Sequence, residues 1–286
     1  MQRAFSLRPR LHAAVFVCAL IVAGCTREPA PAAPHRIDRV VTLAPNVTEI
    51  VFALGAGDRV VGTDDFSDYP PPAKALPKLG GVQANIEKIA ALKPDLVIAK
   101  SGYHPTLPAA LAAAKVPLFV SVTDRLGEIA PAMSAIAQRL GVDSAPAVAK
   151  LQAAVDAQRR TRAKKPRVLF VVLASPLYVA GRETFADDVF NLCGAENAVA
   201  VSGWPQYSLE SLAANPPDLI VHPNRTVARA EVDALLKTMP NAKVRVVAVD
   251  EDRFSRPGPR VGEAAAELNA ILDTFILSGA AKKDLR

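Results

Sequence analysis

The feature that most constrains the fold is a segment of fourteen residues that occurs twice. Residues 85–98 align without a gap on residues 208–221, and six of the fourteen positions are identical. In each copy a capping residue precedes a short amphipathic stretch, and a Pro-Asp pair precedes an apolar run. Two copies are too few for a solenoid, which needs at least about three. We therefore expect two similar lobes, although two unrelated helix–turn–strand units could converge on one pattern.

Apolar runs of strand length recur along the chain, and amphipathic stretches separate them. The runs are continuous rather than alternating, which is typical of parallel strands buried on both faces of a sheet. The predicted fold class is therefore α/β. The strand candidates are residues 40–43, 60–62, 96–99, 118–120, 168–173, 219–221 and 244–249.

The first amphipathic stretch follows the first strand candidate. We expect Asn46 to cap this helix, with the side chain of Glu49 reaching back toward the cap. Gly55 should end the helix, because glycine adopts the left-handed conformation that commonly terminates one.

Residues 142–165 form a long helical pattern with Val148, Leu151 and Val155 on one face. Pro166 marks the expected limit, because the residue before a proline avoids the helical conformation. This pattern divides the chain into an N-terminal lobe at 37–141, a connecting helix at 142–165 and a C-terminal lobe at 166–286. A rigid helix between two α/β lobes would limit hinge motion.

Residues 1–25 have the features of a lipoprotein signal peptide. Arg3, Arg8 and Arg10 precede an apolar run of twelve residues at 13–24, which is too short to span a bilayer. The run ends in Val22-Ala23-Gly24-Cys25, which resembles a bacterial lipobox. That resemblance implies cleavage before Cys25 and a lipid anchor on its sulfur. A plain signal peptide with a chance cysteine is the alternative.

The mature chain would begin with a tether and carry little net charge. Residues 26–36 are rich in Pro and Ala and lack an apolar period. The whole chain has 34 Lys and Arg against 28 Asp and Glu, but three of these bases lie in the leader. The remaining 31 bases against 28 acids make an ordinary mixed surface, which does not indicate nucleic acid as a partner.

Aromatic residues gather in the predicted loops rather than inside strands or helices. Ligands of open α/β sheets bind beyond the carboxyl ends of the strands. Large amphipathic rings in that place suit a bulky ligand with apolar and polar parts, although each ring alone could simply cap the core. The loop aromatics are Phe66, Tyr69, Tyr103, Tyr178, Trp204, Tyr207 and Phe254.

Common catalytic motifs are absent from the sequence, including zinc-protease, nucleophile-elbow, phosphate-loop and Cys-x-x-Cys patterns. We therefore expect no enzymatic activity and no catalytic cofactor. His104 and His222 each follow a predicted strand and could share a metal site across a cleft, although ordinary loop histidines are the simpler explanation. Cys18 would leave with the leader and the sulfur of Cys25 would carry the lipid, so Cys193 would be the one free thiol, which excludes an intramolecular disulfide in the mature chain.

Several segments together resemble the bilobed substrate-binding proteins of ABC importers for vitamin B12, iron–siderophores and haem. The resemblance extends from about Arg39 to about Leu272, and it is strongest with the cobalamin-binding branch. It implies a fold of two α/β lobes bridged by one long helix. Residues 66–71 and 204–206 are the segments that favour cobalamin. Residues 41–49 and 85–99 match the family in general, and residues 181–197 and 252–260 also carry the resemblance.

The resemblance also implies ligand-binding residues. Phe66, Tyr178 and Trp204 match aromatics that line the corrinoid cleft of this family. Asp252 and Arg256 match polar contacts to the ligand. The alternative for the charged residues of 250–256 is a solvated loop with local ion pairs, each worth at most about 1 kcal/mol.

A second implied role belongs to Glu87 and Glu210, which occupy the same place in the two repeats. They match the two carboxylates, one on each lobe, that meet arginines on a dimeric permease. A glutamate in the first turn of a helix is also explained by the helix dipole, so only the pairing of the two supports docking.

The sequence departs from the cobalamin-binding pattern at several positions. Gly81 and Lys100 stand about where two further cleft tryptophans are expected, and Asn269 stands where the disulfide partner of Cys193 is expected. The tyrosine of the haem-binding branch, expected near residues 80–85, is also missing.

These observations predict a periplasmic, lipid-anchored and monomeric receptor that binds cobalamin between its lobes. It would deliver the ligand to an ABC permease with separate ATPase subunits. A ferric siderophore or haem is the alternative ligand. Rival functions are a secreted α/β enzyme using the same cleft, which a metal on His104 and His222 would favour, and a permease-associated sensor without a free ligand.

Overall fold

The computed structural model of the chain describes residues 36–239 and 243–281. The predicted signal peptide, the lipidation site Cys25 and residues 26–35 of the predicted tether lie outside this part. Within the described residues, no helix combines the length and apolar character needed to cross a bilayer.

The first lobe is built on a parallel sheet with the strand order β2-β1-β3-β4. The central strands are buried along nearly their whole length, whereas the edge strand β4 is only partly buried. The strands are β1 (Val40–Leu43), β2 (Val60–Thr63), β3 (Leu96–Lys100) and β4 (Leu118–Ser121). The helices are α1 (Pro45–Ala53), α2 (Ile86–Ala91), α3 (Leu107–Ala113) and α4 (Leu126–Leu140), with 3-10 turns at Gly57–Arg59 and Pro71–Ala75.

The second lobe has a sheet with the order β6-β5-β8-β9, in which the short strand β7 also pairs with β5. All its pairings are parallel except that of β6 with β5. The strands are β5 (Arg167–Ala174), β6 (Leu177–Val179), β7 (Glu196–Asn197), β8 (Leu219–Pro223) and β9 (Arg245–Val249). The helices are α6 (Phe185–Leu192), α7 (Leu209–Ala214), α8 (Arg229–Leu236) and α9 (Glu251–Ser255). The predicted α/β class and all seven predicted strands are confirmed, and β6 and β7 are additional.

The sequence repeat corresponds to a structural repeat. The side chains of Asn85 and Ser208 each accept a hydrogen bond from the backbone N–H three residues later, as a helix cap does. Each short helix is followed by an aspartate whose carboxylate accepts a backbone N–H at the start of a strand. Asp95 accepts from Arg39 before β1, and Asp218 accepts from Arg167 in β5, both at 2.9 Å.

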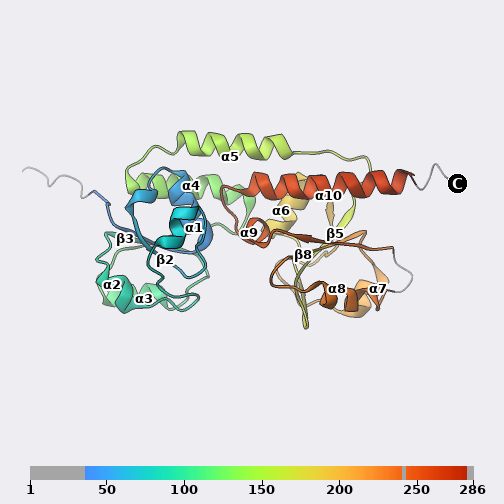
Figure 1. Cartoon of the computed structure of the whole chain (residues 1–286), viewed down its shortest axis with the longest axis horizontal. Coiled ribbons are helices and arrows are strands. Elements are labelled where there is room, and N and C mark those ends of the chain that lie inside the picture. The colour runs from blue at the N-terminus through green and yellow to red at the C-terminus, as the bar shows by residue number, and fades with distance from the viewer. Residues whose placement is uncertain (1–35, 240–242, 282–286) are drawn as a thin grey trace, which may run out of the picture. The chain divides into compact units, whose positions relative to one another are not determined.

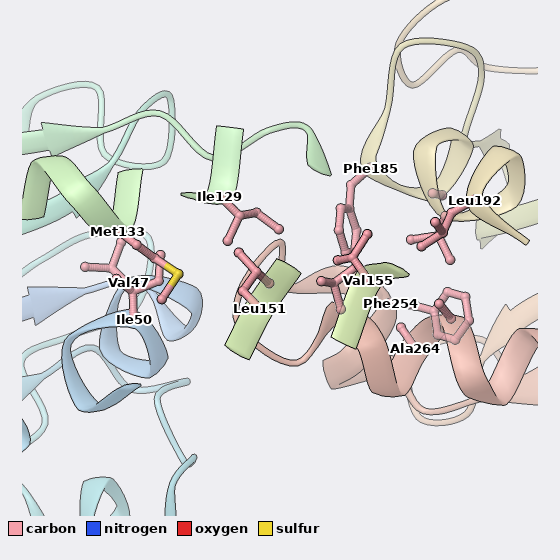
Figure 2. Close-up of a cluster of buried hydrophobic side chains, with 14 of the residues drawn as sticks. Val47, Ile50, Ile129, Met133, Leu151, Val155, Phe185, Leu192, Phe254 and Ala264 are labelled. Atoms are coloured by element: carbon pink, nitrogen blue, oxygen red, sulfur yellow. The ribbon is translucent and has the colours of Figure 1, made fainter. Parts of the chain in front are cut away.

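An apolar core runs without a break from one lobe to the other. Ile129 of α4, Leu151 and Val155 of the connecting helix, and Phe185 of α6 lie in one buried cluster (Figure 2). Each lobe also has a separate cluster on the far face of its sheet. The lobes therefore share a solid interior, and close-packed interiors resist gradual deformation.

The connecting helix α5 (Ala145–Gln158) is shorter than the predicted 142–165, and that boundary is wrong at both ends. Gly141 ends α4 in the left-handed conformation, and Arg159 is extended, well before Pro166. Tertiary contacts hold the following segment: Arg160 N–H donates to the Leu192 carbonyl, and the guanidinium of Arg162 contacts the second lobe. A longer helix, α10 (Val261–Ala281), packs against α5 and was not expected from the sequence (Figure 1).

The predicted cap at Asn46 is also wrong. Helix α1 has Ala44 at its N-cap without a side-chain hydrogen bond, and Pro45 stands in the first turn. Asn46 is buried, and its amide donates to the Thr123 hydroxyl at 2.7 Å and to the Pro257 carbonyl of the second lobe at 3.0 Å. Gly55 follows the helix with a φ of 76°, so the predicted stop is confirmed.

The closeness of α5 and α10 depends on Gly262. A Cβ atom at Gly262 would lie 2.8 Å from the Cβ of Ala154, which is closer than unbonded carbons approach. We expect Gly262→Ala to lower the free energy of unfolding by about 1–3 kcal/mol, because one helix must move. Urea denaturation of the purified protein measures this change.

The matched control for that substitution is Gly127→Ala in α4, where an added Cβ meets nothing within 4 Å. This variant should be neutral or gain up to about 1 kcal/mol, because alanine loses less backbone entropy on folding. Equal midpoints for the two variants would show that the α5–α10 contact does not limit stability.

Candidate functional site

A cleft of about 750 Å³ is lined by residues of both lobes. Its walls come from the segments that follow the carboxyl ends of β1, β2, β3, β8 and β9, which is where open α/β sheets bind ligands. One further wall residue, Trp204, comes from the loop before α7. The lining residues are Ala44, Pro45, Asn46, Asp65, Phe66, Asp68, Lys100, Tyr103, Trp204, Arg225, Glu251, Asp252, Ser255, Arg256 and Pro257.

Four of the five predicted ligand contacts meet in this cleft: Phe66, Trp204, Asp252 and Arg256. Phe66 and Trp204 are 50% and 54% exposed, which is unusual for such large apolar side chains and leaves their rings available to a ligand. Tyr178 is not among the lining residues. It lies on β6 and bridges to Gln206, beside the loop that carries Trp204.

The other loop aromatics have different surroundings. Tyr103 lines the cleft, whereas Tyr207 packs against the core of the second lobe. The ring of Tyr69 lies under the guanidinium of Arg260, 4.0 Å from ring centroid to Cζ, in a separate groove. Phe254 belongs to α9 and is buried against Phe170. Tyr69, Tyr103 and Tyr207 lie in loops as expected, whereas Phe254 lies in a helix and Tyr178 in a strand. Of these five residues, Tyr103 lines the cleft and the other four do not.

A buried chain of hydroxyl groups holds the loop that carries Phe66. Thr48 lies between Thr42 and Ser67, with 2.7 Å separating the hydroxyl oxygens in each pair. The Ser67 hydroxyl in turn contacts the carboxylate of Asp64, which also accepts the backbone N–H of Phe66 at 3.3 Å. Burial raises the pKa of Asp64, while these hydrogen bonds oppose the rise. The result is a fixed backbone beneath an exposed ring.

The Trp204 loop is held by Gly181. The N–H of Gly181 donates to the Gly203 carbonyl at 2.8 Å, and a Cβ at Gly181 would lie 1.9 Å from the Val201 carbonyl oxygen. Because every other residue type would collide with this backbone, only glycine lets the loop approach so closely.

The two positions where tryptophans are expected have other uses. Gly81 packs on Phe66, since a Cβ there would lie 3.0 Å from the ring. Lys100 lines the cleft and forms an ion pair with Asp124. A glycine at 81 therefore leaves room for the Phe66 ring, and Lys100 adds a charge that is already neutralised.

Arg256 joins the two lobes at the cleft. Its guanidinium contacts Asp68 of the first lobe and Asp252 of the second, both at 2.7 Å, and also Glu49 at 3.4 Å. Burial acts to raise the pKa of Asp68, but the hydrogen bond and charge of Arg256 outweigh it and lower that pKa. Arg225 pairs with Asp252. Among the residues that the structure describes, the cations that line the cleft are Lys100, Arg225 and Arg256, and each is ion-paired within the protein.

Sequence reasoning missed Asp68 and Arg225 as cleft residues. The sequence position of each residue could have indicated its place in the cleft. Asp68 lies inside the segment 66–71 that carries the family resemblance, and Arg225 follows β8 at a carboxyl end. Glu49, which was expected at a helix cap, instead bonds to Arg256 and Arg260 across the lobes.

The two histidines are used within their own lobes. The ring nitrogens of His104 lie 2.8 and 2.9 Å from the carbonyl oxygens of Val82 and Leu43. His222 Nδ1 lies 3.0 Å from the carbonyl oxygens of Pro223 and Val227. No cluster of three or more potential metal ligands occurs among the described residues, so the structure gives no support to a shared metal site.

Glu87 and Glu210 occupy equivalent places on the two lobes. Each is exposed and lies in the first turn of its repeat helix, α2 or α7. The two carboxylates are therefore available on the surface.

Cys193 is a buried free thiol, and Asn269 lies nearby on α10. The thiol donates to the Ala265 carbonyl at 3.3 Å. Arg162 links the two positions, because its guanidinium donates to the Cys193 carbonyl and to the Asn269 side chain. Burial raises the pKa of the Cys193 thiol to about 12.

Comparison with known proteins gives consistent results. Residues 40–251 match the model of a family described as periplasmic binding protein. A vitamin B12-binding protein of Yersinia pestis (strain Pestoides F) is 34% identical over 239 residues, which cover 81% of this chain and 85% of that protein.

Solved structures with the same fold include proteins described as haem-binding and as vitamin B12-binding. The periplasmic haem-binding protein RhuT from Roseiflexus sp. RS-1 has a TM-score of 0.73 at 31% identity, covering 82% of this chain and 97% of that one. The periplasmic vitamin B12-binding protein BtuF of Vibrio cholerae has a TM-score of 0.69 at 29% identity, covering 85% and 99%.

The high pKa of Cys193 predicts an inert thiol. At pH 8 we expect the native protein to react with a disulfide reagent at least about a hundredfold more slowly than the urea-unfolded protein, because the thiolate is the reactive form. Mass spectrometry of the peptide that contains Cys193 measures the rate. Equal reaction rates for the native and the unfolded protein would contradict the burial of the thiol.

The raised pKa of Cys193 also affects stability. The unfolded chain loses the thiol proton at a lower pH than the native protein does, so the thiol's contribution to stability declines as pH rises above about 8.5.

Proposed function

Since the chain belongs to the periplasmic binding protein family, in the group that serves vitamin B12, haem and siderophores, we propose that it binds cobalamin and delivers it to an ABC permease. The observation that carries this proposal is the cleft between the lobes, where exposed aromatic rings stand beside polar groups that are already paired. Its volume of about 750 Å³ is within the range of about 300–1,000 Å³ usual for small-molecule sites.

The charges of the cleft favour a ligand that carries amides rather than carboxylates. Lys100, Arg225 and Arg256 are each neutralised by a carboxylate of the protein. An anionic ligand would have to displace one of those carboxylates. The corrin ring of cobalamin instead carries amide side chains, whose N–H groups can donate to lining carboxylates such as Asp65 and Asp252.

Haem is the second candidate, because haem-binding proteins are among the similar structures and Tyr103 lines the cleft. A haem iron takes an axial ligand from the protein, for which a tyrosine can serve. Burial and the charge of Asp64 raise the pKa of Tyr103, which works against the phenolate form that binds iron. Cobalamin brings its own lower axial base, so it makes no such demand on the cleft.

The aromatic residues would hold the apolar faces of the ligand. In this arrangement Phe66 and Trp204 contact the ring system from opposite lobes, and Asp252 accepts hydrogen bonds from its rim. Tyr178 supports the Trp204 loop through the bridge to Gln206. Arg256 would hold the carboxylates of Asp68 and Asp252 in place, and it could also bond to the rim of the ligand directly.

Delivery would use Cys25, Glu87 and Glu210. A lipid on Cys25 would anchor the periplasmic receptor to a membrane, with residues 26–36 as a tether. Glu87 and Glu210, one on each lobe, would meet arginines on a two-subunit permease whose ATPase subunits drive transport. The receptor itself acts as a monomer without catalysis.

Calorimetric titration of the purified protein with cyanocobalamin, haemin and a ferric siderophore tests the ligand. We expect saturable one-to-one binding of cyanocobalamin, and Trp204→Ala should weaken it by about tenfold or more through loss of buried aromatic surface. Val201→Ala is the matched control, because Val201 is exposed in the same loop but does not line the cleft. Binding of haemin alone would move the assignment to the second candidate.

Uptake of labelled cobalamin by cells that express the receptor with its permease tests delivery. The double variant Glu87→Ala with Glu210→Ala should keep its affinity for ligand and lose transport by at least about tenfold, because two charged contacts to the permease disappear. Glu231→Ala is the control, since Glu231 is also exposed in the first turn of a helix but lies outside the repeat. Unchanged uptake by the double variant would remove the docking role.

A further inference from the structure

A buried carboxylate of the first lobe lies between two arginines of the second. The side chain of Glu49, on α1, is only 2% exposed. Arg260 forms a two-pronged contact with it, with nitrogen–oxygen distances of 2.8 and 2.6 Å, and Arg256 approaches one of the same oxygens at 3.4 Å. Burial raises the pKa of Glu49, and the hydrogen bonds and charges of Arg260 and Arg256 oppose the rise.

Glu49 stands behind the cleft rather than in it. It lines a separate groove of about 580 Å³ between α1, α5 and α10, together with Tyr69 and Arg260. A ligand in the cleft meets Arg256 but not Glu49. Arg256 is the cleft residue whose side chain bonds to the Glu49 carboxylate, so the direct route from Glu49 to that ligand is through Arg256.

Several contacts hold the Arg256 guanidinium in one position. Its side chain is 10% exposed, and besides Glu49 it contacts Asp68, Asp252 and the carbonyl of Phe66 at 3.2 Å. These partners belong to both walls of the cleft. The guanidinium therefore links the Phe66 loop of the first lobe to α9 of the second. Carboxylates of the protein balance its positive charge.

We propose that Glu49 is a positioning residue that determines ligand specificity. By holding Arg256 against its partners in both lobes, Glu49 keeps the cleft walls together and withholds a positive charge from anionic ligands. The part of this inference that concerns cobalamin and haem rests on the proposed function. The part that concerns the placement of Arg256 does not.

Trp204 provides a test that needs no ligand. It is the single tryptophan of the chain and lines the same cleft as Arg256, so its fluorescence reports on the cleft. In Glu49→Gln the guanidinium loses a charged partner. We expect quenching by iodide, relative to quenching by neutral acrylamide, to rise by about twofold, because a released positive charge attracts the anion. Glu49→Asp should restore most of the original ratio.

Asp188→Asn is the matched control. Asp188 of α6 pairs with Arg125 at the start of α4, so it also joins the two lobes, but it does not line the cleft. This variant should lose stability and leave the iodide-to-acrylamide ratio unchanged. An unchanged ratio in Glu49→Gln, or an equal change in Asp188→Asn, would overturn the proposal.

Ligand titration gives the second readout. Glu49→Gln should weaken cyanocobalamin binding and strengthen haemin binding, narrowing the ratio of the two affinities by about tenfold. If Glu49→Gln does not fold, Asp68→Asn removes another partner of Arg256 from a side chain that is 43% exposed, and the same shifts are expected. If the unaltered protein binds neither ligand, the proposed function fails, and the quenching ratio still decides the role of Glu49.

Discussion

The structure depends on the apolar core that the two lobes share. Ile129, Leu151, Val155 and Phe185 come from three different helices, α4, α5 and α6, and lie in one buried cluster, so the cores of the two lobes are continuous on that side. Packed interiors of this density have discrete arrangements rather than gradual ones. Side chains that lie outside the cleft therefore contribute to the spacing of its walls.

The charged residues near the cleft follow from the same packing. The segment 256–260 between α9 and α10 contacts the first lobe: Arg256 bonds to Glu49 and Asp68, and Arg260 bonds to Glu49. The positive charges are thus neutralised inside the protein before any ligand arrives. What remains open to a ligand is aromatic surface and carboxylate oxygen, which suits a large, uncharged molecule with many hydrogen-bond donors.

Local rules predicted the elements well where nothing distant competed. Asn85 and Ser208 cap their helices as the sequence indicates, because each side chain has only its own helix to satisfy. Asn46 has an equally suitable sequence position, yet its amide bonds to Thr123 and Pro257. The end of α5 differs from its pattern for the same reason, since Arg160 and Arg162 bond to the second lobe instead of continuing the helix.

The sequence by itself determined the α/β class, seven of the nine strands in the described residues, the paired lobes and the end of the strands at which polar and aromatic residues gather. Each of these follows from periodicity or from residues close together in the chain. Only the tertiary structure decided which aromatics share a cleft, with Phe66 and Trp204 inside it and Phe254 buried elsewhere. It also decided that Glu49 faces two arginines more than 200 residues away. The physical reason is that such contacts depend on how the strands are ordered and how the helices cross, and no local pattern encodes either.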